Sequence, residues 1–191
     1  MSIPFLKSAD RQFNYYKQLG EKAMEQLNDE QLFWQPNPES NSIALIVKHL
    51  RGNMLSRWTD FLTTDGEKPN RNRDSEFENN WTTRQQLLDA WKEGWDCLFA
   101  ALGSITDDDL ERIVYIRNEG HSILEAINRQ LAHYPYHVGQ MIYIAKICKN
   151  EDWQSLSIPR NKSNDYNNDK FSQEKGVRHF TDSLLDKKEE K

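Results

Sequence analysis

The chain has 191 residues, enough for one domain that buries roughly two-thirds of the surface its unfolded form exposes. Its net charge is −5 and its pI is near 5.6, and it has no lysine- and arginine-rich block with interleaved aromatic residues, so the usual electrostatic signature of a nucleic-acid binder is missing. The longest apolar stretch, residues 43–47, is too short to span a bilayer, and the first residues lack a basic and apolar leader pattern. We therefore expect a cytoplasmic protein without nucleic-acid or membrane partners.

The first part of the chain predicts two long helices separated by a short one. Apolar residues recur every three or four positions over residues 5–27, while charged and amide side chains fill the opposite face. Residues 29–34 resemble a short capped turn that two nearby prolines end. Ser42 is a good N-cap for a second long helix, which we expect to run to about Leu62.

A long connection is predicted next, followed by a third helix. Residues 63–80 are polar and show neither helical nor strand periodicity, which is typical of a crossover. Thr82 and Thr83 are each followed three residues later by a glutamine, a pattern that resembles a capping box. The third helix is expected to end at Gly103.

The last predicted elements are a short extended segment and a fourth helix. Residues 113–116 are crowded with β-branched and aromatic side chains, which favour extended backbone. Ser122 and Glu125 form a second capping-box pattern, and the apolar stripe that follows continues to about Lys149.

Four long amphipathic helices with one long central connection predict an all-α fold. The best fit is a four-helix bundle in which a long crossover lets helices 2 and 3 run parallel. We expect this domain to cover residues 1–167. Residues 168–191 are rich in polar and charged side chains and predict a weakly ordered C-terminal tail, in which Phe171, Phe180 or Leu184 and Leu185 could dock locally.

Two histidines on the fourth predicted helix, His133 and His137, lie four residues apart. An α-helix turns by about 100° per residue, so the two side chains leave the helix axis in directions that differ by only about 40°. Both imidazoles can therefore reach one metal ion. Gln140 lies on the same strip of the helix and could orient a ligand from outside the coordination sphere. Pro135 lies between the histidines and should kink the helix, which would either splay them apart or widen a cleft.

A third histidine, His49, lies far upstream on the second predicted helix, at the border of a face of small polar residues. Three imidazoles with open coordination positions suit a metal that serves hydrolysis or group transfer. The pattern also fits a bundle in which the histidines merely pack, because a boundary histidine is most often satisfied or solvent-facing. His121 and His179, in a loop and in the tail, are weaker candidates.

Other catalytic motifs are missing from the sequence. It contains no Gly-x-Gly-x-x-Gly, P-loop, His-Glu-x-x-His, Cys-x-x-Cys or Gly-x-Ser-x-Gly pattern, so the local signatures of dinucleotide binding, nucleotide hydrolysis, zincin proteolysis and serine hydrolysis are absent. No glutamate forms a Glu-x-x-His pair with His133 or His137, which favours a mononuclear site over a di-iron site.

Four segments together resemble the DinB superfamily of metal-binding four-helix bundles, within a branch known only as a domain of unknown function. These segments are Asn41–Leu50, Tyr115–Glu119, Ala126–Gln140 and Leu156–Ser163. The resemblance covers roughly residues 5–167. The chain departs from the family pattern at Pro135, where a non-proline residue is more usual, and at Asn161, where a glycine is expected.

The resemblance implies that His49, His133 and His137 hold one divalent ion, zinc or nickel, with water completing its coordination. Some members of the superfamily are thiol-dependent transferases or isomerases, which implies a low-molecular-weight thiol and a small-molecule electrophile as reactants. Other members have no known activity, so a non-catalytic, stress-associated metal-binding or scaffold protein is the alternative. No catalytic base is identifiable in the sequence. Pairing through exposed helical faces, common in this family, implies a possible homodimer.

Overall fold

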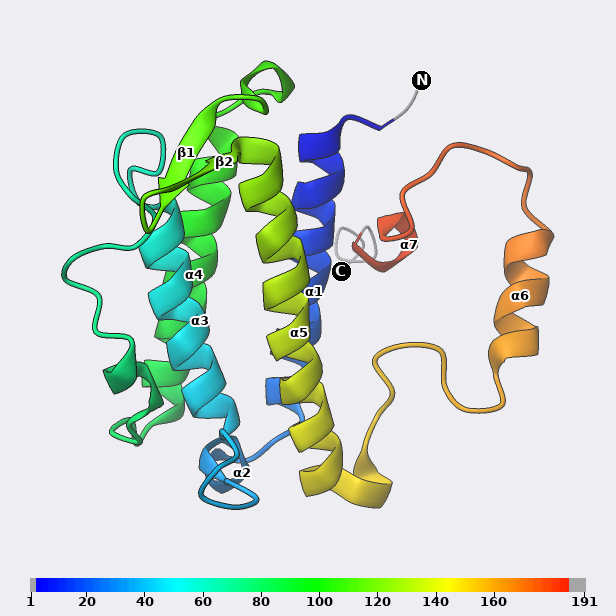
Figure 1. Ribbon diagram of the computed structural model, residues 1–191. Helices are drawn as coiled ribbons and strands as arrows, with labels where there is room; N and C mark the ends of the chain where they lie inside the picture. Colours follow the sequence, from blue (N-terminus) through cyan, green and yellow to red (C-terminus); the bar gives the residue numbers. More distant parts are fainter. Residues whose placement is uncertain (1–2, 186–191) are drawn as a thin grey trace.

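The computed structural model describes residues 3–185, and these residues confirm the prediction of a mainly helical fold (Figure 1). The four long helices are α1 (Phe5–Glu25), α3 (Ile43–Trp58), α4 (Arg84–Gly103) and α5 (Ile123–Lys149). The shorter helices are α2 (Asp29–Phe33), α6 (Ser163–Phe171) and α7 (Asp182–Leu185), with single 3₁₀ turns η1 (Asp74–Phe77), η2 (Asp107–Asp109) and η3 (Asn150–Asp152). None of the helices within residues 3–185 combines the length and the apolar character that a membrane span requires.

Three of the long helices begin at the caps that the sequence predicts. The Ser42 hydroxyl accepts a hydrogen bond from a backbone N–H in the first turn of α3. Thr83 and Ser122 each form a full capping box, in which the side chain three residues later accepts a hydrogen bond from the backbone N–H of the cap. Helix α3 ends four residues earlier than predicted, because Thr59 is extended and Asp60 adopts a positive φ of 46°.

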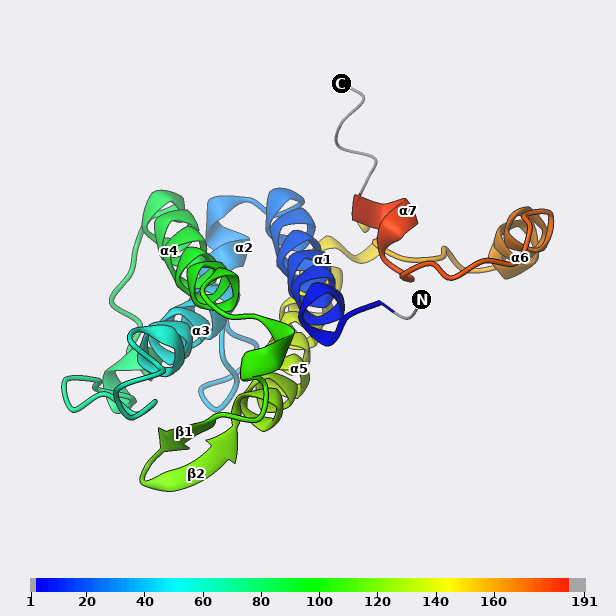
Figure 2. The ribbon, with the colours of Figure 1, turned by 90° about the horizontal axis from the view of Figure 1, so that it is seen from above.

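The four long helices lie side by side around one core, as the end-on view shows (Figure 2). Helix α3 packs mainly on α4, and α1 packs mainly on α5. Trp95 is fully buried among other aromatic residues, with ring centroids 6.4 Å from Phe13, 5.4 Å from Trp91 and 5.9 Å from Tyr134. This aromatic cluster joins three of the helices and fixes their spacing.

Tyr134 ties α5 to α3 next to the predicted metal site. Its hydroxyl donates a hydrogen bond to Asn53 Oδ1 at 3.2 Å and accepts one from Trp58 Nε1 at 3.0 Å. Burial raises the pKa of Tyr134, so the hydroxyl stays protonated and can donate. Because His133 precedes this anchored tyrosine directly, its place relative to α3 is fixed.

The predicted extended segment is strand β1 (Ile113–Ile116), and it pairs antiparallel with β2 (Glu119–Ser122). The two-residue turn between them, Arg117 and Asn118, has positive φ at both positions, 56° and 62°, as a type I′ turn requires. The carboxylate of Asp65 accepts hydrogen bonds from the backbone N–H groups of both turn residues, each at 2.8 Å. The connection between α3 and α4 therefore holds the tip of the hairpin.

We expect Asp65→Asn to reduce the free energy of unfolding by about 1 kcal/mol at neutral pH, because the new amide nitrogen cannot accept a hydrogen bond from the turn. Burial opposes ionisation of Asp65, but three backbone N–H donors outweigh it and hold its pKa below the usual value. The stabilising contribution is complete above the unfolded pKa of about 3.9 and is lost as the pH falls through the lower folded pKa. Urea unfolding at pH 7 and at successively lower pH checks this: wild type and variant should converge in acid.

The matched control for this prediction is Asp89→Asn on the exposed face of α4. Asp89 is exposed, and within residues 3–185 it accepts a side-chain hydrogen bond only from Gln85, one helical turn away. Its substitution should change the free energy of unfolding by less than about 0.5 kcal/mol. An equal loss in both variants would contradict the role assigned to Asp65.

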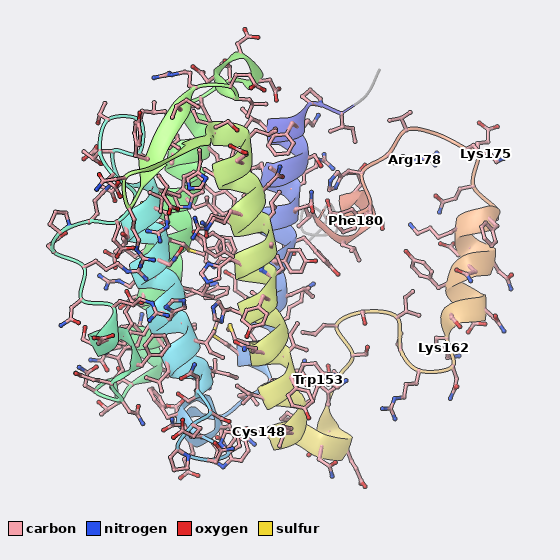
Figure 3. The ribbon with its side chains drawn as sticks, in the orientation of Figure 1. Cys148, Trp153, Lys162, Lys175, Arg178 and Phe180 are labelled. Carbon is pink, nitrogen blue, oxygen red and sulfur yellow. The ribbon has the colours of Figure 1, made fainter. Side chains whose placement is uncertain are left out.

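The C-terminal segment leaves the four long helices and then returns to α1 (Figures 1 and 3). Helix α6 stands apart, and Phe171 at its end is exposed, whereas Phe180 packs edge-on against Tyr15 with ring centroids 5.8 Å apart. His179 Nε2 lies 3.1 Å from Ser8 Oγ. The predicted boundary at residue 167 thus falls within α6, and residues 186–191 of the predicted tail lie outside the described part of the chain.

Candidate metal centre

The structure brings three predicted histidines together between α3 and α5. One ring nitrogen from each of His49, His133 and His137 lies within 4.8 Å of the others. The Nε2 atoms of His133 and His137 are 3.1 Å apart, and the His49 ring centroid is 5.5 Å and 4.9 Å from theirs. His49 is buried and the other two are half-buried, so the cluster lies at the edge of the core.

A hydrogen bond orients each of the three rings through its Nδ1 atom. Glu76 Oε2 accepts from His49 at 2.8 Å, Gln130 Oε1 accepts from His133 at 3.2 Å, and Gln140 Oε1 accepts from His137 at 2.8 Å. Acceptors at Nδ1 place the ring proton there and leave Nε2 as a free lone pair. The Nε2 atoms are therefore the nitrogens available to a cation.

Glu76 comes from η1, within the connection of residues 59–83, and is itself held by an arginine. Arg71 Nε donates to Glu76 Oε1 at 2.7 Å, and Arg71 Nη2 donates to Oε2 at 2.9 Å. Burial opposes ionisation of Glu76, but the hydrogen bonds from His49 and Arg71 prevail and keep its pKa below the usual value. An ionised Glu76 fixes the orientation of the His49 ring through this hydrogen bond.

The electrostatics of the cluster keep the histidine pair neutral. Burial, then the neighbouring imidazoles of His137 and His49, lower the pKa of His133 to about 3. Burial also lowers the pKa of His137, against the opposing effect of its hydrogen bond to Gln140. Two unprotonated Nε2 lone pairs 3.1 Å apart repel each other unless a cation lies between them.

The donor set fits a divalent transition metal. Zinc binds imidazole at about 2.0–2.1 Å, which places the nitrogens of a tetrahedral site about 3.3 Å apart. The 3.1 Å separation in the histidine pair is close to this value, and the third nitrogen approaches within 4.8 Å. Three neutral imidazoles suit zinc and nickel alike.

Pro135 does not separate the two histidines. Helix α5 continues through it from Ile123 to Lys149. Proline removes one backbone hydrogen bond, to the carbonyl of Leu131, but Tyr134 and Val138 on either side are fully buried and anchor the helix in the core. The splaying considered from the sequence is therefore absent, and the Nε2 atoms converge.

Two of the residues that orient the rings could not be identified from sequence motifs. Glu76 belongs to a polar segment without periodicity, and no local pattern distinguishes it from the surrounding acidic residues. The only hint for Gln130 is its spacing. It lies three residues before His133, and Gln140 lies three residues after His137. His121, on β2, and His179, against α1, lie outside the cluster.

A cleft of about 500 Å³ opens over the three histidines. Phe77 forms part of its wall and stacks on His49, with ring centroids 5.2 Å apart, and Tyr136 lies beside His137 at 4.9 Å. Among residues 3–185, no aspartate or glutamate lines this cleft. A small molecule can therefore reach the histidines, but it meets no carboxylate that could act as a base.

We expect Gly52→Ala to weaken metal affinity by about 10- to 100-fold, the usual cost of disturbing an outer partner of a metal ligand. A Cβ atom at Gly52 would lie 2.2 Å from Glu76 Oε1, so the carboxylate would have to move away from His49. Competition for zinc with a chromophoric chelator measures the change.

Gly139→Ala is the matched control on α5. A Cβ atom there meets nothing within 4 Å, although Gly139 lies between His137 and Gln140. Metal affinity should stay at the wild-type value, and the free energy of unfolding should rise by about 0.5–1 kcal/mol because alanine favours the helix interior. Unchanged affinity in Gly52→Ala would show that Glu76 does not support the site.

Comparison with known families adds one finding. The family model described as "Protein of unknown function (DUF1572)" matches residues 1–162, a span that contains the four long helices, the hairpin and all three clustered histidines. No curated protein and no solved structure matches the chain. Because the family model covers well over half of the sequence, the chain belongs to the DUF1572 family.

Proposed function

We propose that this protein is a DinB-type metalloprotein in which His49, His133 and His137 hold one divalent ion, zinc or nickel. In this proposal α1, α3, α4 and α5 form the four-helix bundle of that superfamily, and residues 59–83 are its long crossover. The supporting observation is the convergence of three ring nitrogens whose partners at Nδ1 leave Nε2 free.

We further infer that the protein is a transferase that joins a low-molecular-weight thiol to a small electrophile. When bound, a divalent ion lowers the pKa of a thiol or water and supplies a nucleophile at neutral pH. Three protein ligands leave coordination positions for an outside molecule, and the cleft gives access to them. This open access supports the transferase over a site closed by protein.

The reaction would need little proton chemistry from the protein. The thiol proton leaves to solvent, the sulfur lone pair forms a carbon–sulfur bond, and the bond from that carbon to its leaving group breaks with its electron pair. Glu76, Gln130 and Gln140 hold the imidazoles in place, while Phe77 and Tyr136 form part of the cleft wall beside them.

A metal-binding protein without catalysis is the second candidate, and one observation favours it. Glu67 and Glu76, which pair with arginines of the cleft, are not free to act as bases, and among residues 3–185 no aspartate or glutamate lines the cleft. Storage or scaffolding would need no base.

Metal analysis and turnover on the untagged full chain test both candidates. Zinc- or nickel-loaded protein is offered bacillithiol, mycothiol, glutathione or coenzyme A together with a panel of electrophiles, and metal-free protein is the control. The transferase predicts metal-dependent product formation or thiol binding. Metal binding without either result would favour the non-catalytic candidate, and equal, negligible metal in wild type and His137→Ala would exclude both.

A further inference from the structure

Arginine side chains dominate the wall of the cleft over the three histidines, although the chain as a whole carries a net charge of −5. They come from α3, the connection of residues 59–83, the hairpin turn and α5. The arginines are Arg57, Arg71, Arg73, Arg117 and Arg129. A positive cleft in an acidic protein is not explained by the overall composition.

Only part of this positive charge is neutralised within the protein. Glu67 Oε2 lies 3.0 Å from Arg57, 3.4 Å from Arg71 and 3.1 Å from Arg117, and it thus serves three guanidinium groups at once. Glu76 is shared between Arg71 and His49. Five guanidinium groups line the cleft, and the two carboxylates that pair with them, Glu67 and Glu76, cannot neutralise all five.

Arg57 carries a buried donor without a partner. Its side chain is only 6% exposed, and one of its Nη atoms donates to Gly66 O and to Glu67. Its Nε atom is buried and has no hydrogen-bond partner within residues 3–185. A buried charged donor is costly to leave unpaired, so the charge of Arg57 is only partly compensated within the described residues.

Arg73 and Arg129 are exposed at the cleft and form no ion pair within the described part of the chain. The Arg73 guanidinium lies 5.3 Å from the ring centroid of Phe77, which stacks on His49. Arg129 lies one helical turn before His133 on α5, so its side chain shares a face with the histidine pair. Both groups are placed to reach a molecule held at the metal site.

Arg117 occupies a backbone position that usually favours glycine or asparagine. Its φ of 56° lies in the left-handed region, which is unfavourable for a residue with a long side chain. The type I′ turn of the hairpin requires this conformation. The turn places an arginine at the rim of the cleft.

We propose that this cleft binds an oxyanion of a small molecule, a carboxylate or phosphate group, through Arg73, Arg117 and Arg129. Planar guanidinium groups bind such groups through paired, charge-assisted hydrogen bonds. The cleft volume of about 500 Å³ suits a small molecule. The proposal rests on the proposed function in one respect: the oxyanion belongs to the thiol or the electrophile that reacts beside the three histidines.

Calorimetric titration of the full chain with succinate and with inorganic phosphate tests the proposal. Diethyl succinate and triethyl phosphate are the uncharged counterparts, and the titrations use both metal-stripped and zinc-loaded protein at low ionic strength. We expect at least one oxyanion to bind metal-stripped protein, the esters not to bind, and Arg73→Gln/Arg129→Gln to lose at least ten-fold in affinity. Both substituted residues are exposed, so the variant should fold.

The control is Arg160→Gln/Arg178→Gln, which changes the net charge equally. Both residues are exposed and lie outside the cleft, and Figure 3 shows Arg178 on the C-terminal segment, away from α3 and α5. This variant should bind the oxyanion as wild type does. Equal weakening in both double variants, or no binding of either oxyanion, would overturn the proposal.

Metal content measured on the same samples separates this inference from the proposed function. Oxyanion binding by a protein that never takes up metal would leave the inference standing and exclude the metalloprotein. Metal uptake without binding of either oxyanion would support the metalloprotein and exclude the inference about the oxyanion. The arginine variants should keep the wild-type metal content, because neither residue holds an imidazole.

Discussion

His133→Ala is expected to lose metal binding, with an affinity more than about 100-fold below that of the wild type, since changes to outer partners alone cost 10- to 100-fold. His133 and His137 present Nε2 atoms 3.1 Å apart from consecutive turns of one helix. Removing one of them leaves His49 and His137 as an incomplete chelate across two helices. Elemental analysis after dialysis against a weak chelator, followed by competition titration, measures the loss.

His121→Ala is the control for this prediction, because His121 lies on the hairpin outside the cluster. It should bind metal as the wild type does, and circular dichroism should show the same helix content for both variants. Wild-type metal content in His133→Ala would exclude the three-histidine site.

Trp95→Ala is expected to reduce the free energy of unfolding by about 3–5 kcal/mol, the usual cost of truncating a buried aromatic side chain. Trp95 is fully buried between α1, α4 and α5, in contact with Phe13, Trp91 and Tyr134. For a chain of this length the loss corresponds to a fall in Tm of roughly 6–20 °C. Thermal unfolding followed by circular dichroism measures it.

Tyr143→Ala provides the matched aromatic truncation on an exposed surface. Tyr143 lies on α5 and is 68% exposed, so its loss should change the free energy of unfolding by less than about 0.5 kcal/mol. Because Tyr134 belongs to the Trp95 cluster and also bonds Asn53 and Trp58, Trp95→Ala should weaken metal binding as well. If Trp95→Ala lowered the Tm no more than Tyr143→Ala does, the aromatic cluster would not be what holds the helices together.

The helix starts were predictable because helix caps are local. Ser42, Thr83 and Ser122 bond to backbone groups within three residues, and no distant residue is needed to place them. The end of α3 was predicted four residues too late, because apolar periodicity continues beyond Trp58 while the backbone turns at Asp60. Asn161, where a glycine is expected, has a φ of 65°, which asparagine tolerates better than most residues.

The pairing of β1 with β2, in contrast to the helix caps, depends on a contact between residues far apart in the sequence. The sequence predicted extended backbone at β1 but gave no sign of β2, since Glu119–Ser122 contains no residue with strong β propensity. Its pairing depends on the turn at Arg117 and Asn118, which Asp65 holds from more than 50 residues away. Such a contact leaves no local pattern.

Four long helices, three of their N-caps and the histidine pair could be predicted from residues alone, because each depends on spacing within a few residues along the chain. Local spacing could not show that His49 meets that pair, which only the family resemblance implied. Nor could it show that Glu76 orients the His49 ring or that arginines from four separate segments surround the cleft. These contacts depend on how α3, α5 and the connection of residues 59–83 pack, and that packing is set by the whole core.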